Sequence, residues 1–272
     1  MILINGQPET MLSVADRGLQ YGDGLFETIP FRNGRLEYLK EHTERLLRGC
    51  KRLQIDFNDV AALERELLIV CNQISSDGVI KIILTRGSGG RGYKPPIDST
   101  PQRIIAFHPL PDYPLNHQSG ITVQLCSTRL AKNPLLAGIK HLNRLEQVIA
   151  RNEWDSADIA EGLMLNYDDE LIEGTMSNVF LVSDGCLLTP HLNSSGIEGV
   201  MRERILALAC ILDLPHEIVT LTLDDLYQAD EVFVTNSLIR VWPVTALHGT
   251  NKQWPHGDIT KRIQKALDTA ES

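Results

Sequence analysis

The sequence has 272 residues, 43% of them hydrophobic and 22% charged, which is the composition of an ordinary globular protein. A formal net charge of −9 argues against nucleic acid and anionic membranes as partners, because both require a clustered basic surface. The five cysteines form no Cys-x-x-Cys pair, the N-terminus does not resemble a signal peptide, and no apolar stretch has transmembrane length. We therefore expect a soluble, cytoplasmic protein without disulfides or a zinc site.

The first third of the chain alternates strand-like and helical patterns. Asn5-Gly6 is a typical hairpin turn, and apolar residues at helical intervals follow it. The glycines and prolines of residues 86–96 exclude regular structure there. The predicted elements are a hairpin over residues 1–12, helices over 42–52 and 60–71, and strands over 79–85 and 103–107.

A domain boundary is predicted after these elements. Residues 109–120 contain three prolines among polar residues, a composition typical of a linker. We expect a small domain over residues 1–110, a linker over 111–120 and a larger domain over 121–272. Alternating strands and helices favour an α+β or α/β fold. The later elements are strands over 121–127, 162–167, 179–182, 186–189 and 231–235, and helices over 143–154, 200–212 and 258–270.

Lys140 is a candidate nucleophile. Small and apolar residues precede it directly before a predicted helix, so its amine is expected to be partly desolvated. Desolvation favours the neutral amine that Schiff-base chemistry requires. The alternative is a solvated surface lysine, which is what most lysines are.

Two features are candidate phosphate sites. Arg45, on a predicted helix, offers a planar fork that matches phosphate oxygens, although a solvent-facing arginine is the commoner case. Val200 and Met201 begin another predicted helix, where backbone N–H groups and the helix dipole favour an anion. Every helix has such an end, so this second signal is weak by itself.

Three further side chains are candidates for a site. Glu173 lies between apolar residues and needs a partner, either a structural one or the ring nitrogen of a heteroaromatic cofactor. Ser237, after a predicted strand and beside Asn236, can donate to a phosphate or stabilise a turn. Thr28 carries a hydroxyl group, but threonine is also simply a good strand former.

Several other site classes are disfavoured. The glycine-rich residues 87–92 lack the Gly-Lys-Ser/Thr ending of a phosphate loop and the spacing of a dinucleotide site. No histidine stands in a recognisable metal-ligand spacing, and no Gly-x-Ser-x-Gly elbow is present.

Five ordered segments resemble one family, the fold-type IV pyridoxal-phosphate enzymes, and the similarity runs from Asn5 to about Val244. This family contains branched-chain and D-amino acid aminotransferases and aminodeoxychorismate lyases. The segments are SVADRGLQYGDGLFET (residues 13–28), HTERL (42–46), IKHLN (139–143), IEGTMSNVF (172–180) and GVMR (199–202).

The resemblance implies pyridoxal 5′-phosphate as the cofactor. It implies that Lys140 forms a Schiff base with the cofactor and that Glu173 pairs with the pyridine nitrogen. The phosphate would be held by the residues Arg45, Val200, Met201, Asn236 and Ser237. It also implies a small α+β domain, a larger barrel-like domain, a cofactor between them, and a homodimer.

Three stretches resemble the lyase members of the family, which convert 4-amino-4-deoxychorismate to 4-aminobenzoate and pyruvate in folate biosynthesis. They are LTRGSGGRGY (residues 84–93), KNPLLAGIKHLNRLEQV (132–148) and QADE (228–231). Met201 stands where aminotransferase relatives commonly have threonine, which also favours the lyase.

For this reaction Thr28 or Lys140 would protonate the leaving group, and Arg91 and Tyr93 would bind the substrate carboxylates. A branched-chain or D-amino acid aminotransferase is the alternative function. A cofactor-free binding protein with the same fold is a second alternative, which Lys140 and Glu173 together argue against.

Overall fold

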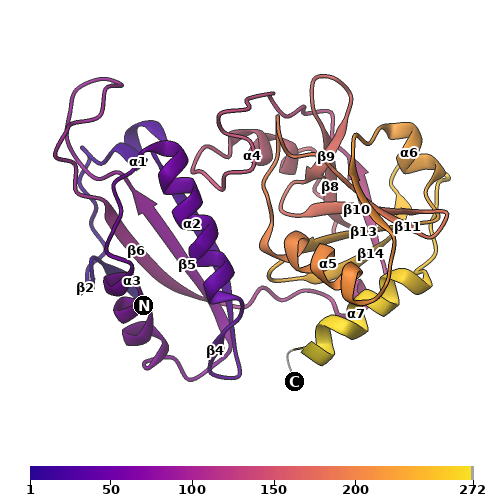
Figure 1. Cartoon of the computed structure of the whole chain (residues 1–272), viewed down its shortest axis with the longest axis horizontal. Helices are drawn as coiled ribbons and strands as arrows, with labels where there is room; N and C mark the ends of the chain where they lie inside the picture. Colours follow the sequence, from indigo (N-terminus) through magenta and orange to yellow (C-terminus); the bar gives the residue numbers. More distant parts are fainter. Residues whose placement is uncertain (271–272) are drawn as a thin grey trace. The chain divides into compact units, whose positions relative to one another are not determined.

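The computed structural model in Figure 1 describes residues 1–270 and divides into two compact units. The first unit contains Met1–Asp112 and Ile139–Asn143, and the second contains Tyr113–Gly138 and residues 144–270. Ile139–Asn143 thus differs from the sequence expectation, which placed it in the larger domain. The reason is backbone pairing: the Phe26 N–H donates to the Lys140 carbonyl at 3.0 Å, and the Leu142 N–H donates to the Gly24 carbonyl at 3.0 Å.

The first unit is an antiparallel six-stranded sheet in the order β2-β1-β6-β5-β3-β4. Asn5 and Gly6 turn the predicted β1–β2 hairpin with φ values of 50° and 78°. The strands are β1 (Ile2–Ile4), β2 (Gln7–Pro8), β3 (Gly24–Arg32), β4 (Arg35–Leu36), β5 (Gly78–Thr85) and β6 (Gln102–Pro109). The helices are α1 (Arg17–Tyr21), α2 (Leu39–Leu53) and α3 (Val60–Cys71).

Strand β3 positions much of the chemistry of this unit. Its side chains alternate between the two faces of the sheet, and Leu25, Ile29 and Phe31 are buried in one core with residues of α2 and α3. Glu27 belongs to the same alternating row and therefore lies among these apolar side chains. Ile139 joins this core too, which holds the segment that carries Lys140 against the sheet.

The second unit is built on eight strands in the order β12-β11-β10-β13-β14-β7-β8-β9. An additional pairing of β9 with β10 closes β10, β13, β14, β7, β8 and β9 into a ring, so the expected barrel-like domain is confirmed. Helices α5 and α7 pack against β13, and α7 also contacts β14. The strands are β7 (Ile121–Leu125), β8 (Ile159–Leu165), β9 (Leu171–Gly174), β10 (Asn178–Ser183), β11 (Cys186–Pro190), β12 (His216–Val219), β13 (Glu231–Asn236) and β14 (Arg240–Leu247). The helices are α4 (Leu145–Arg151), α5 (Val200–Ile211), α6 (Leu223–Gln228) and α7 (Asp258–Ala270), with a 3₁₀ turn η1 at Leu115–Gln118.

Most predicted elements occur, with shifted ends. The helix predicted over residues 143–154 is shorter, because the chain leaves the helix in a turn at Asn152. The strand predicted over 162–167 begins at Ile159 and ends at Leu165, and the predicted linker contains the η1 turn. Within residues 1–270, no helix is long and apolar enough to cross a membrane.

Candidate active site

Lys140 and Thr28 lie on the same face of the first unit's sheet. An isolated antiparallel β-bridge pairs Leu25 with His141, which places Lys140 opposite Phe26. Residues that lie opposite each other in an antiparallel pair project their side chains to the same side of the sheet. Thr28 follows Phe26 by two residues and shares that face. The Lys140 amine is half-buried and lies 4.5 Å from the centroid of the Phe26 ring. The two predicted catalytic side chains are therefore brought together on one face.

Arg45 belongs to a buried cluster that the sequence analysis missed. Its Nε donates to Glu27 Oε1 at 2.8 Å, its Nη2 donates to Glu27 Oε2, and His42 Nδ1 lies 2.6 Å from the same Oε2. Burial opposes the ionisation of Glu27, but Arg45 and His42 outweigh it and lower the pKa of the carboxyl group to about 2. The charged Glu27 within the largely apolar strand β3 could have indicated this cluster from the sequence.

Arg91 and Tyr93, the predicted substrate contacts, are exposed on the loop after β5. The backbone of this loop is nevertheless held by hydrogen bonds. The buried Arg17 donates to the carbonyls of Gly92 at 3.0 Å and Tyr93 at 2.8 Å, and its Nε bonds to Asp23 at 2.9 Å. The structure therefore orders the backbone of this loop while leaving both predicted side chains accessible.

Glu173 is buried in β9 of the second unit and has polar partners, as its apolar neighbours in the sequence required. Oε2 accepts from the Ile197 N–H at 2.8 Å, and Oε1 accepts from Gln147 Nε2 at 3.3 Å. Arg144 interacts with it electrostatically. These contacts fix the position of the carboxylate in the second unit.

The predicted anion site at Val200 and Met201 is the N-terminus of α5. Both residues are buried, and the N-cap Gly199 provides no side-chain hydrogen bond. The first N–H groups of a helix have no partner within the helix, so this end presents backbone donors. A Cβ atom on Gly199 would lie 2.0 Å from Asn178 Oδ1, so the close approach of the backbone requires glycine.

Asn236 and Ser237 lie where β13 ends in a turn. Asn236 Oδ1 accepts from the N–H groups of Leu238 at 2.8 Å and Ile239 at 3.0 Å. Its Nδ2 donates to the Met176 carbonyl at 3.0 Å. The Asn236 side chain therefore shapes this turn and fixes it to the loop after β9. Ser237 is half-buried within the turn.

The predicted residues of the second unit converge at one end of its sheet. Strand register aligns Glu173 with Asn178 and Asn178 with Thr235, the residue before Asn236. Asn178 Nδ2 donates to the Ile197 carbonyl at 2.8 Å, and Ile197 is followed closely by α5. Within the second unit, the Glu173 carboxylate thus lies near both the N-terminus of α5 and the turn that follows β13.

Glu161 is a second buried acid that the sequence analysis missed. Its carboxylate accepts from the Thr175 hydroxyl at 2.5 Å, the Ser177 hydroxyl at 2.6 Å and the backbone N–H groups of Gly162, Thr175 and Met176. Burial raises the pKa of Glu161. Its contacts hold the loop that directly follows Glu173.

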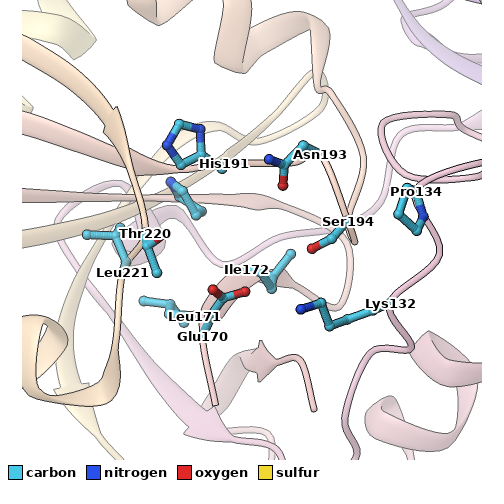
Figure 2. Close-up of a pocket in the computed structure, with 11 residues that line it drawn as sticks. Lys132, Pro134, Glu170, Leu171, Ile172, His191, Asn193, Ser194, Thr220 and Leu221 are labelled. Atoms are coloured by element: carbon cyan, nitrogen blue, oxygen red, sulfur yellow. The ribbon is translucent and has the colours of Figure 1, made fainter. Parts of the chain in front are cut away.

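A cavity of about 420 Å³ in the second unit contains none of the predicted site residues (Figure 2). Lys132, Glu170 and Leu171 are among its lining residues. Lys132 is ion-paired with Asp168, and Glu170 accepts from the Asn166 side-chain amide at 2.6 Å. The two charged side chains in the lining therefore already have polar partners, and the cavity gives no sign of catalysis.

Comparison with known proteins finds relatives that match nearly the whole chain. Aminodeoxychorismate lyase of Vibrio harveyi is 39% identical over 272 residues, covering 99% of this chain and all of that protein. D-alanine aminotransferase of Bacillus licheniformis is 31% identical, covering 99% and 96% of the two chains. The crystal structure of 4-amino-4-deoxychorismate lyase from Pseudomonas aeruginosa superposes with a TM-score of 0.95 at 48% identity, covering 99% and 98%.

The family assignment rests on most of the chain rather than on a single motif. The model of the family described as amino-transferase class IV matches residues 24–247, a span that includes Lys140, Glu173 and the α5 N-terminus. The chain therefore belongs to the class IV aminotransferase family of enzymes.

Proposed function

We propose that this enzyme is a pyridoxal-phosphate lyase that converts 4-amino-4-deoxychorismate to 4-aminobenzoate and pyruvate. The observation that carries the proposal is the 48% identity to the Pseudomonas aeruginosa lyase over 99% of the chain, with a TM-score of 0.95. Lyase-like sequence around Lys140, and Met201 in place of the usual aminotransferase threonine, support the same reaction.

The donor groups in each unit suit the parts of pyridoxal phosphate. The uncapped N-terminus of α5 and the Arg45 guanidinium suit a phosphate dianion. The buried Glu173 carboxylate suits a protonated pyridine nitrogen, and the half-buried Lys140 amine suits an aldehyde. We assign Ser237, with the backbone near Asn236, as a further phosphate donor.

When bound, pyridoxal phosphate supplies an electron sink for the electrons released as the substrate loses a proton. Lys140 removes that proton from the ring carbon that bears the substrate's amine. The C–O bond to the enolpyruvyl group then breaks and the ring becomes aromatic. Thr28, on the same sheet face as Lys140, or Lys140 itself, delivers a proton to the departing group, which leaves as pyruvate. We assign Arg91 and Tyr93 to the substrate carboxylates.

The Lys140→Ala variant tests the cofactor assignment. We expect the wild-type protein to show a visible absorbance band that borohydride removes, and the variant to lack it, because only Lys140 forms the covalent link. An unchanged, borohydride-sensitive band in the variant would refute the assignment.

A product assay separates the lyase from its rival. The family and the 31%-identical D-alanine aminotransferase favour amino-group exchange as the second candidate function. Incubation with 4-amino-4-deoxychorismate is expected to give equal amounts of 4-aminobenzoate and pyruvate. Absence of both products, together with amino-group exchange between an amino acid and a keto acid, would instead identify an aminotransferase.

The proposal extends to assembly and place of action. We propose a cytoplasmic homodimer that functions in folate biosynthesis, following the family resemblance. Sedimentation analysis of the purified protein tests the dimer.

A further inference from the structure

The most unusual buried group in the first unit is the set Glu27, His42 and Arg45. Their exposed fractions are 1%, 0% and 7%. The carboxylate belongs to β3, whereas the imidazole and the guanidinium belong to α2, which packs over that strand. One carboxylate thus joins two nitrogen-bearing side chains that are one helical turn apart.

The contacts fix the guanidinium in a defined orientation. Glu27 accepts from both Nε and Nη2 of Arg45, so the planar group cannot rotate about its final bonds without breaking these contacts. A guanidinium carries five N–H donors, of which the Glu27 contacts use two. Arg45 is accordingly held along one edge by Glu27.

His42 is suited to hold Glu27 in turn. Burial lowers the pKa of His42, although Glu27 raises it, while Arg45 and Lys140 lower it further. A neutral imidazole donates from Nδ1 to the carboxylate without adding a charge to the core. Its contact to Oε2 leaves Glu27 Oε1 to receive Arg45 Nε.

Fold stability alone explains this cluster poorly. Buried ion pairs are on average no more stabilising than apolar side chains of similar size. The same unit also satisfies a buried acid with one hydrogen-bonding side chain: Glu66 accepts from Nε and Nη2 of Arg103, whose charge also interacts with Asp59. The additional histidine points to a requirement for precise orientation.

We propose that Glu27 is a positioning residue that orients Arg45 toward the phosphate of the cofactor, with His42 holding Glu27 in place. This inference rests on the proposed function. Orientation before binding avoids the loss of side-chain freedom on binding, so the cluster raises affinity for the phosphate group specifically.

The experiment compares two ligands that differ only in phosphate. Cofactor-free full-length protein is titrated with pyridoxal phosphate and with pyridoxal, and the dissociation constants are read from visible absorbance. For Glu27→Gln we expect about tenfold weaker binding of pyridoxal phosphate and unchanged binding of pyridoxal, because one immobilised side chain contributes on that scale. His42→Gln should show a smaller effect of the same kind.

Two further variants distinguish positioning from general damage. Glu66→Gln breaks the comparable pair with Arg103 and should leave both dissociation constants unchanged. When Arg45→Ala is already present, adding Glu27→Gln should not weaken pyridoxal phosphate binding further, because Glu27 affects this binding only by orienting Arg45. Thermal unfolding of each variant confirms that it is folded at the titration temperature.

The outcomes separate this inference from the proposed function. If wild type binds pyridoxal phosphate and Glu27→Gln binds it equally well, or loses affinity equally for both ligands, positioning is refuted and the cofactor assignment stands. If the wild-type protein binds no pyridoxal phosphate, the proposed function fails first and this inference fails with it.

Discussion

Thr28 lies two residues from Phe26, whose ring contacts the Lys140 amine, on one face of an ordered strand. We predict that Thr28→Val lowers the turnover number by about 100-fold, because a positioned proton donor contributes rate factors of that order. The visible cofactor band should remain, since Thr28 has no role in the covalent link. Steady-state formation of pyruvate and an absorbance spectrum measure the two effects.

The Thr28→Ser variant is the matched control, since it retains a hydroxyl group at the same Cβ. It should recover most of the activity that valine loses. If valine and serine variants both turn over like wild type, Lys140 alone supplies the proton to the departing group.

Individual residues show how far the sequence could define the site. The motifs identified Arg45 and Glu173 as single side chains, but not the contacts that surround them. Glu27 lies 18 positions from Arg45 and reaches it only because β3 packs against α2. Glu161 similarly meets Ser177 across a strand and a loop. Such pairs depend on tertiary packing, which local spacing does not encode.

At the scale of elements, strong periodicity gave reliable predictions. The helices α3 and α7 begin and end at the predicted residues, and the strands predicted over 179–182 and 186–189 form the antiparallel pair β10–β11. The sequence analysis missed β14, in which Pro243 lowers the strand signal although it pairs with Phe233. The parallel pairing of β14 with β7, which the barrel also requires, joins residues more than 100 positions apart in the sequence and has no sequence signature.

The residue that follows β5, Arg86, forms a partly buried ion pair with Asp23. Arg86 Nε and Nη2 bond to the carboxylate at 2.8 and 3.0 Å, and the same guanidinium donates to the carbonyls of Leu53 and Gln54 after α2. We predict that Arg86→Ala lowers the free energy of unfolding by about 3 kcal/mol, because Asp23 keeps only Arg17 and the carbonyls of Leu53 and Gln54 lose a charged donor. Urea unfolding measures the difference.

An exposed ion pair of the same unit provides the control. Lys40 and Glu44 are 3.9 Å apart on α2, with side chains 84% and 53% exposed. Removal of the Lys40 side chain should cost less than about 1 kcal/mol. Equal costs for Arg86→Ala and Lys40→Ala would contradict the structural role assigned to Arg86.

At the scale of the whole molecule, titratable groups with shifted pKa values link folding to pH. Burial opposes the ionisation of Asp23, but Arg86 and Arg17 outweigh it and lower the pKa of this carboxyl group. The pKa of Glu27 is lowered in the same way, and burial lowers the pKa of His42. All three groups bind protons more weakly in the folded chain than in the unfolded chain. Acid therefore favours unfolding through each of them.

Glu27 allows a quantitative prediction for this acid sensitivity. Its pKa falls from 4.5 to about 2 on folding, which corresponds to about 3 kcal/mol of stability that is present above pH 4.5 and lost as the pH falls toward 2. Urea unfolding of cofactor-free protein between pH 7 and pH 3 should therefore show decreasing stability. Glu27→Gln should be less stable than wild type at pH 7, and the difference should shrink below pH 4.5, because the variant has no carboxyl group to protonate. Parallel stability curves for the two proteins would mean that the Glu27 carboxylate is not held ionised by Arg45 and His42.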